Sequence, residues 1–242
     1  MDSLTNAQIR LIRSLKDKKF RDEHGLFVVE GEKLVREAMA SAYEVEAIYR
    51  QEEVGEQAMS RISFCSTPSP VLALVRIPSW LRTGQCATGH RDCPEGLCLA
   101  LDSVRDPGNM GTILRVADWF GVSAVFMSAD CTDIYSPKVV QATMGSIFRV
   151  KTIEADIPSL CRQFRSVGRP VYGTLLDGES IYTSRLSCSS LVVMGNESNG
   201  ISEAVRRELS AGLRIPSFAQ SGAESLNVAV ATAVTLSEFR RR

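Results

Sequence analysis

The feature that most constrains the fold is a regular alternation of short β-rich runs with helical patterns from residue 97 to the C-terminus. The β-rich runs are LCLALDSV, SAVFMSA, SIFRVKTI, PVYGTLL, SLVVMG and LRIPSF, and the helical segments between them include TILRVADWFG, PSLCRQFRSVG and SEAVRRELSAG. Such alternation predicts parallel strands joined by crossover helices. We therefore predict an α/β domain with a parallel sheet for residues 97–242.

The first 76 residues predict a second, smaller α/β domain. Here GLFVVEG, VEAIYR and ISFCS are expected to be strands, and EKLVREAMAS and PVLALV are expected to be helical. Residues 77–96 are rich in glycine and proline and have no periodicity, which is typical of a linker. The expected organisation is therefore a domain over residues 1–76, a linker over 77–96 and a large domain over 97–242.

Composition narrows the class of protein. The 242-residue chain is 44% hydrophobic and 23% charged, which is ordinary for a folded globular protein. No apolar run approaches the roughly 20 residues that a membrane helix needs. The N-terminus MDSLTNAQIRLIR also lacks the charged-then-apolar order of a signal peptide. We expect a cytosolic protein that does not associate with membranes.

The seven cysteines are odd in number and scattered, so no disulfide framework is expected. One stretch, CATGHRDCPEGLC, offers Cys86, His90, Cys93 and Cys98 as zinc ligands. Its spacing matches no common ligand pattern, and Cys98 falls inside a predicted buried strand. We therefore expect no metal, and a zinc site is the weaker alternative.

Basic residues are concentrated near both ends of the chain, although the formal net charge is zero. The N-terminal group consists of Arg10, Arg13, Lys16, Lys18, Lys19 and Arg21. The C-terminal group is Arg240, Arg241 and Arg242. A solvated helix face with a basic tail is the common reading of such runs. A patch that contacts nucleic-acid phosphates is the alternative, and it needs support from elsewhere in the chain.

Three unusual loops follow predicted strands, so they fall at the carboxyl edge of a parallel sheet, where ligands bind. The loop DSVRDPGNMGT leads into a helix whose Arg115 and Trp119 point away from its apolar face. The loop GNESNG places Glu197 directly after a buried strand. The loop AESLN puts Glu224, Ser225 and Asn227 at the entrance of a helix that is expected to begin at Leu226, is apolar nearly all round and is expected to be buried on most sides. N-capping explains one of these three polar residues, whereas a bound ligand would give partners to all of them.

These loops resemble the motifs of the SpoU/TrmH family of RNA ribose 2′-O-methyltransferases, which belongs to the SPOUT class. The three family motifs appear in order as NMGTILR, as ESNG, and as Ile215-Pro216 followed by SLNVAVA. DIYSPKVVQATMGSIFRV also matches the stretch between the first two motifs. In the N-terminal part, SLKDKKFRDEHGLFVVEGEKLVREA resembles the substrate-binding domain that many members carry in front. Together these segments cover nearly the whole chain.

The resemblance implies an enzyme that uses S-adenosylmethionine, acts on structured RNA as a homodimer, and contains a trefoil knot in its C-terminal domain. It implies a catalytic group made of Asn109, Arg115, Glu197, Ser225 and Asn227. It places S-adenosylmethionine on Gly195, Ile215 and Leu226. By the same resemblance the basic N-terminal stretch would hold RNA, and ribosomal RNA is favoured over transfer RNA.

Two departures from the family pattern concern RNA and cofactor binding. Gln141 and Thr143 stand where many members have arginine and serine, which puts one RNA-phosphate contact in doubt. The loop between Pro216 and Ser225 is longer than the usual form, so its geometry around the cofactor is expected to differ.

Arg115 is the residue that the family resemblance implies as acceptor of the ribose hydroxyl proton. A guanidinium, with a pKa above about 12, stays protonated in proteins. We therefore favour a role in binding the phosphate of the target nucleotide and orienting the hydroxyl. Trp119, on the same side of the helix, is expected at a subunit interface.

Two functional alternatives remain at this stage. One is a transfer-RNA 2′-O-methyltransferase, and the other is a non-catalytic RNA-binding protein that retains the fold. The intact motif residues oppose the second alternative, and Gln141 favours it. A nucleotide-dependent oxidoreductase is disfavoured because the sequence lacks the G-x-G-x-x-G pattern.

Overall fold

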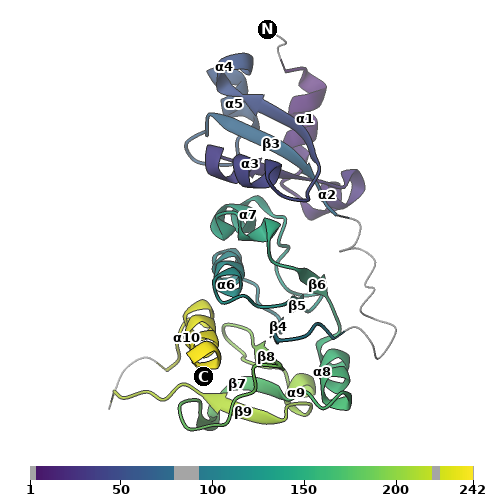
Figure 1. The fold of residues 1–242 in the computed structure, drawn as a ribbon. Helices are drawn as coiled ribbons and strands as arrows, with labels where there is room; N and C mark the ends of the chain where they lie inside the picture. Colours follow the sequence, from purple (N-terminus) through teal and green to yellow (C-terminus); the bar gives the residue numbers. More distant parts are fainter. Residues whose placement is uncertain (1–3, 79–92, 220–223, 242) are drawn as a thin grey trace. The chain divides into compact units, whose positions relative to one another are not determined.

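The computed structural model of the chain describes residues 4–78, 93–219 and 224–241. These residues pack as two compact units (Figure 1). The first unit consists of the described residues within 1–82 and 133–149, and the second of those within 83–132 and 150–242. The chain therefore leaves the second unit after Thr132 and returns to it at Val150.

The first unit contains a three-stranded antiparallel sheet in which β3 lies between β1 and β2. Its elements are α1 (Asn6–Ser14), α2 (Lys18–His24), β1 (Leu26–Glu30), α3 (Glu32–Met39), β2 (Val45–Arg50), α4 (Gln51–Val54), α5 (Glu56–Ile62), β3 (Val71–Arg76), α7 (Pro137–Thr143) and the 3₁₀ helix η2 (Ser146–Phe148). Helices α1 and α5 cover one face of the sheet. Their buried contribution to the core is Ile9, Ile12, Met59 and Ile62, which pack with Leu26, Val28, Leu72 and Leu74 of the sheet.

Strand β3 differs from the sequence-based prediction for this unit. The run PVLALV was predicted to be helical and ISFCS to be a strand, whereas the structure forms a strand over Val71–Arg76 and ends α5 at Ile62. A short apolar run has no periodicity that distinguishes a buried strand from a buried helix. Backbone pairing with β1 on one side and β2 on the other decides in favour of the strand, whose first five residues are buried.

Residues 133–149 also differ from the prediction, because they pack in the first unit rather than with the rest of 97–242. The rings of Phe27 on β1 and Tyr135 lie 4.6 Å apart, and Phe148 packs edge-on against Tyr43 at 5.2 Å. This aromatic cluster explains why the segment leaves the second unit. It also divides the predicted strand SIFRVKTI, of which only Thr152 and Ile153 lie in a strand, the one over Thr152–Glu154.

The second unit is built on a six-stranded sheet in the order β6-β5-β4-β8-β7-β9, and every neighbouring pair is parallel. Its elements are β4 (Leu97–Leu101), α6 (Pro107–Trp119), β5 (Val125–Met127), β6 (Thr152–Glu154), α8 (Ile157–Ser166), β7 (Val171–Ser180), β8 (Ser190–Met194), α9 (Glu203–Arg206), β9 (Ala211–Arg214) and α10 (Val228–Arg241). The predicted parallel α/β fold is confirmed. Two of the predicted strands end earlier than expected, LCLALDSV at Leu101 and LRIPSF at Arg214.

Helices cover both faces of this sheet (Figure 1), with α8 and α9 on one face and α6 and α10 on the other. Cys98 and Ala100 of β4 pack in the core formed with α8 and α9. Because side chains alternate along a strand, Leu97, Leu99 and Leu101 point to the opposite face. Burial on both faces explains why β4 is apolar at every position.

The strand order places β4 and β8 side by side at the centre of the sheet. From β4 the chain moves outward through β5 to β6, whereas β7 and β9 lie beyond β8. Loops that follow strands at such a reversal diverge and leave room for a ligand. Two of the three predicted motif loops start here. The trefoil knot that the family resemblance implies stays a prediction.

Candidate active site

The polar loops that follow β4 and β8 are held together from their first residues. The backbone N–H of Asp102 donates to the carbonyl of Met194 at 2.9 Å, so the two strands remain paired to their ends. The Asp102 carboxylate accepts a hydrogen bond from the backbone N–H of Ser202 at 2.7 Å. This contact fixes the far end of the loop after β8, at the start of α9.

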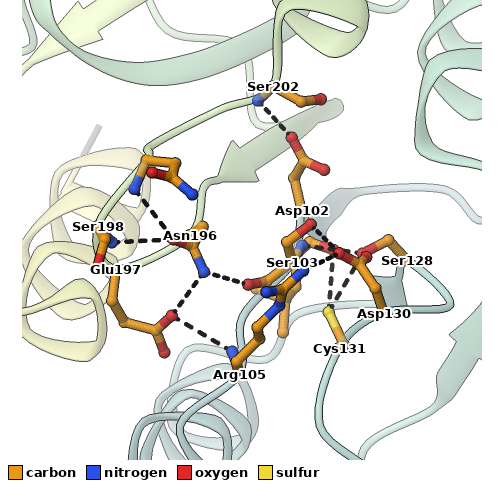
Figure 2. A network of polar contacts seen from close by, with 12 residues as sticks. Asp102, Ser103, Arg105, Ser128, Asp130, Cys131, Asn196, Glu197, Ser198 and Ser202 are labelled. Atoms are coloured by element: carbon orange, nitrogen blue, oxygen red, sulfur yellow. Dashed lines mark hydrogen bonds and ion pairs between the residues drawn. The ribbon is translucent and has the colours of Figure 1, made fainter.

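Glu197 accepts four hydrogen bonds at this edge, and Figure 2 shows those from Arg105 and Asn196. Its Oε1 accepts from the backbone N–H of Asp106 at 3.0 Å and from Asn109 Nδ2 at 3.1 Å. Its Oε2 accepts from the backbone N–H of Arg105 at 3.3 Å and from Asn196 Nδ2 at 3.2 Å. A carboxylate that receives amides at the N-terminus of α6 is also favoured by the helix dipole.

These contacts keep Glu197 ionised. Partial burial raises the pKa of Glu197, but hydrogen bonds from its own backbone amide, from Asp106 and Arg105 and from Asn109 lower it more. The pKa of Glu197 therefore lies below its usual value. A fixed negative charge stands at the edge of the sheet where the three loops meet.

Asn109 connects Glu197 to the C-terminal helix. Its Oδ1 accepts a hydrogen bond from Asn227 Nδ2 at 2.8 Å. The Oδ1 of Asn227 accepts in turn from the backbone N–H groups of Ala229 and Val230, at 2.9 and 3.3 Å, and so caps α10. The orientation of each amide follows from its neighbour, because a carboxylate only accepts and a backbone N–H only donates. Residues from three separate motifs thus form one continuous chain of contacts.

Gly195 makes the turn after β8 possible. A Cβ at this position would lie 2.2 Å from the carbonyl carbon of Gly200 and 2.3 Å from the N of Ile201, closer than any real contact. Asn196 and Gly200 form a backbone bridge across the same turn. The glycine is therefore required by close approach of the chain to itself, in addition to the cofactor role that the family resemblance implies.

The other two predicted cofactor residues lie on either side of residues 220–223 in the sequence. These four residues, which include Gly222, are outside the described part of the chain. Ile215 is half-buried directly after β9, and Leu226 is 50% exposed before α10. Phe218, between them in sequence, is 88% exposed. Apolar surface is therefore available on both sides of residues 220–223, and Leu226 directly precedes Asn227 of the polar network.

Two predicted catalytic residues do not join the network. Arg115 is exposed on α6, and its side chain forms no hydrogen bond or ion pair with any residue that the structure describes. It lies six residues after Asn109, hence about 9 Å further along the helix and on a different side of it. Ser225 is also exposed. The structure leaves both side chains available to a substrate or a partner.

Sequence reasoning missed a second group of polar residues at this edge (Figure 2), of which Arg105 and Asn196 contact Glu197 directly. The group is Asp102, Ser103, Arg105, Ser128, Asp130 and Asn196. Ser128 and Asp130 follow β5, so they also lie at the carboxyl edge of the sheet. The polar run SADCTD after an apolar strand could have identified them, since loops at that edge converge.

Some of the basic side chains near the two ends of the chain form hydrogen bonds with other residues of the protein. Arg21 is only 3% exposed and donates to Asp133 Oδ2 at 3.0 and 2.7 Å, so its assignment to an exposed basic patch was wrong. Arg240 donates to the carbonyls of Phe120 and Gly121 at the end of α6.

Gln141 and Thr143 have structural contacts within the first unit. Thr143 is fully buried and donates to the carbonyl of Val140 at 2.7 Å. Gln141 is half-buried and its Nε2 lies 3.3 Å from Cys65 Sγ. The burial of Thr143 removes it from any surface that contacts RNA in this conformation.

Neither a metal site nor a membrane segment is found among the described residues. Within residues 4–78, 93–219 and 224–241, no group of three or more His, Cys, Asp and Glu side chains is placed to hold a metal. Cys86 and His90 of the alternative zinc site lie outside these ranges, and Cys98 is buried in β4. Over the same ranges, no helix combines the length and apolar character needed to span a bilayer.

Comparison with known proteins shows the family of this chain. The model of the SpoU rRNA Methylase family matches residues 96–237, which is more than half of the chain. The chain belongs to the SpoU rRNA methylase family. In this SpoU-family chain, residues 6–62 also match the MRM3-like substrate binding domain. The recognition from sequence motifs is thereby confirmed.

Individual relatives agree over nearly the full length of this SpoU-family chain. The chain is 30% identical over 256 residues to the Bacillus subtilis protein named 23S rRNA (guanosine(2553)-2′-O)-methyltransferase RlmP, with 99% of this chain and 98% of that protein covered. An AdoMet-bound rRNA methyltransferase from Sinorhizobium meliloti superposes with a TM-score of 0.85 at 34% identity, covering 100% and 97% of the two chains. A TrmH-family protein from Porphyromonas gingivalis superposes with a TM-score of 0.86 at 38% identity, covering 98% of each.

Proposed function

We propose that this protein transfers the methyl group of S-adenosylmethionine to a ribose 2′-hydroxyl of ribosomal RNA. The observation that carries the proposal is the chain of contacts from Glu197 through Asn109 to Asn227, which joins the three motif loops at the reversal point of the sheet. Relatives named as rRNA 2′-O-methyltransferases support the choice of reaction and of RNA.

The residues at this edge fit S-adenosylmethionine. The half-buried Ile215 and the exposed Leu226 offer apolar surface for its adenosine and methionine parts. The ionised Glu197 complements its positive sulfonium. When bound, this cosubstrate supplies the electrophilic methyl group. Gly195 would be the third residue of the cofactor site, because the turn that it permits brings backbone groups to the same edge.

The chain's own residues would act mainly by holding geometry, because alignment in a displacement reaction can account for about 7–11 kcal/mol of the barrier. Asn109, Glu197 and Asn227 would fix the three loops relative to one another. Ser225, exposed beside Asn227, would contact the cofactor or the nucleotide. Arg115 would bind the phosphate of the target nucleotide and orient its 2′-hydroxyl.

The Arg115→Lys substitution tests the role of the guanidinium. Lysine keeps the charge but loses the planar fork that binds phosphate with two hydrogen bonds. RNA affinity and the rate of methyl transfer should therefore fall together. A collapse of the rate with unchanged RNA affinity would contradict the role in phosphate binding.

The choice of RNA and the presence of catalysis are tested together. Purified protein is titrated with S-adenosylmethionine in a calorimeter and then incubated with methyl-labelled cosubstrate and either unmodified ribosomal RNA or unmodified transfer RNA. Binding of the donor with label in ribosomal RNA is expected. Label in transfer RNA alone would favour the alternative substrate, and no binding of the donor would favour a non-catalytic RNA-binding protein.

We also propose that the first unit binds RNA, because its residues 6–62 match the MRM3-like substrate binding domain. We propose in addition that the protein is a homodimer. Trp119 is 85% exposed and lies one helical turn from Arg115 on α6, while Val230 of the neighbouring helix α10 is 49% exposed. Exposed large apolar side chains of this kind are typical of interfaces. Sedimentation of the parent protein as a dimer and of Trp119→Arg as a monomer is the expected result. A monomeric parent protein would contradict the proposal.

A further inference from the structure

We propose that Asp130, which lies outside the three family motifs, is a positioning residue for Glu197 and acts through the loop from Ser103 to Arg105. The proposal rests on the role of Glu197 in the proposed function. The inference goes beyond that function in one respect. Backbone amides of the loop from Ser103 to Arg105 and of Asp106 bind the Glu197 carboxylate, and the contacts of Asp130 set the conformation of this loop.

Asp130 forms hydrogen bonds with both ends of this loop, Ser103 and Arg105 (Figure 2). Its Oδ2 accepts from Ser103 Oγ at 2.5 Å and from Arg105 Nη2 at 3.1 Å. Its Oδ1 accepts from Ser128 Oγ at 2.7 Å. One carboxylate therefore connects the loop after β4 with the loop after β5.

Ser103, which Asp130 contacts, has a backbone conformation that serine rarely adopts. Ser103 has a φ of 63°, in the left-handed region that favours glycine. Its N–H donates to Ser128 Oγ at 2.9 Å and its own hydroxyl donates to Asp130. Strained conformations of this kind persist only where the surrounding contacts hold them, and they are frequent at functional sites.

The held loop presents three groups to the residues after β8. The carbonyl of Ser103 accepts from Asn196 Nδ2 at 2.7 Å. The backbone N–H groups of Arg105 and Asp106 donate to Glu197. If Ser103 relaxes, all three groups change direction, so both Asn196 and Glu197 lose their orientation.

The serine contacts, rather than the ion pair, are the basis of the proposal. The side chains of Arg105 and Asp130 are 66% and 46% exposed, and an ion pair between exposed side chains contributes little. The hydroxyls of Ser103 and Ser128 hold the loop against its preferred conformation. Removing the carboxylate should therefore affect the geometry of the site more than the stability of the fold.

The test compares Asp130→Ala and Asp130→Asn with Asp156→Ala. Asp156 is a matched control, because it is an exposed aspartate of the same unit whose carboxylate accepts from a backbone N–H, that of Ser159, away from the site. In Asp130→Asn the amide oxygen still accepts from Ser103, and the amide nitrogen donates to Ser128 Oγ. Each variant is assayed for methyl transfer at saturating donor and RNA, and for thermal stability.

The expected result is a loss in kcat of about 10- to 100-fold for Asp130→Ala, since small misplacements at a reacting centre have effects of this size. Asp130→Asn should recover most of the rate, and Asp156→Ala should keep the parent rate. Equal rates for Asp130→Ala and Asp156→Ala would overturn the proposal, as would a failure of Asp130→Asn to recover the rate.

A second measurement separates this inference from the proposed function. Amide protons that donate to a carboxylate resonate downfield, so the Arg105 and Asp106 amides are followed by ¹H–¹⁵N spectroscopy without any substrate. Asp130→Ala and Glu197→Ala should both move these resonances upfield, whereas Asp156→Ala should leave them in place. Unmoved resonances in Asp130→Ala would overturn the positioning role even in an active enzyme. Shifted resonances in a protein that transfers no methyl group would preserve that role and reject the proposed reaction.

Discussion

Asp130 and Glu197 are ionised carboxylates of one network, but their charges have different surroundings. Hydrogen bonds from Ser103 and Ser128 lower the pKa of Asp130 to about 2. Glu197 is more enclosed, and backbone amides supply most of the hydrogen bonds that lower its pKa. At the residue scale, the site is therefore an arrangement of donors around two negative charges.

The low pKa of Asp130 predicts how its contribution to stability depends on pH. A carboxylate whose pKa is lower in the folded state stabilises the fold above its unfolded pKa of about 3.9, and this contribution is lost as the pH falls through the folded value. The difference in melting temperature between the parent protein and Asp130→Asn should be constant above pH 5 and should shrink from pH 4 toward pH 2. Thermal unfolding monitored across this range checks it, and a difference that grows toward low pH would contradict it.

The residue types of the site could be predicted from the sequence, but their burial could not. Asn109, Glu197 and Asn227 were identified from their motifs, and they meet in the structure. Arg21 and Arg115 look alike in the sequence, yet one is buried against Asp133 and the other is exposed. The burial of Arg21 depends on a contact with a residue more than a hundred positions away, so the sequence around Arg21 does not predict it.

At the scale of elements, Asn227 combines two tasks at the start of α10. Its Oδ1 caps the helix and its Nδ2 reaches Asn109 on α6. The side chain therefore joins the stability of one helix to the position of the motif on another.

Substitutions of Asn227 should separate these two tasks. Asn227→Ala removes both, and loss of the cap should lower the free energy of unfolding by about 0.5–2 kcal/mol. Asn227→Ser keeps a capping oxygen but is too short to reach Asn109, so stability should stay near that of the parent protein while kcat falls. Calorimetric unfolding and methyl-transfer rates measure the two effects. Parent-like activity in Asn227→Ser would contradict a role for the link.

Elements with a clear period were easier to predict than short apolar runs. Helix α8 was expected within PSLCRQFRSVG and forms over Ile157–Ser166. The run PVLALV, predicted to be helical, became β3 because two partner strands pair with it. Helix α10 was expected to begin at Leu226 and to be buried on most sides, whereas it begins at Val228 and leaves Val230 half exposed.

At the scale of the whole molecule, the excursion of residues 133–149 into the first unit is the main feature that the sequence did not predict. Its basis is a set of contacts between distant segments, including the ion pair of Arg21 with Asp133 and the packing of Phe27 on Tyr135. A family match that runs continuously over residues 96–237 does not indicate such an excursion.

This organisation predicts that the second unit does not fold well by itself. Deleting residues 1–78 would remove β1 and α2 and would expose the buried side chains of the excursion, which are Tyr135, Val139, Val140, Ile147 and Phe148. Because contiguous apolar surface promotes association, the truncated chain should aggregate in size-exclusion chromatography. A truncated chain in which Tyr135, Val139 and Phe148 are replaced by serine should aggregate less. A monodisperse, fully folded truncation without those replacements would contradict the prediction.

The loops joined by Glu197, Asn109 and Asn227 are proposed as a site for ribose methylation of ribosomal RNA. The most direct measurement is a nucleotide-resolution map of 2′-O-methylation in ribosomal RNA from cells that lack this gene, complemented with either the parent protein or Glu197→Ala. One methylated position should disappear without the gene, return with the parent protein and fail to return with an equally abundant Glu197→Ala variant. An unchanged map, or full restoration by Glu197→Ala, would contradict it.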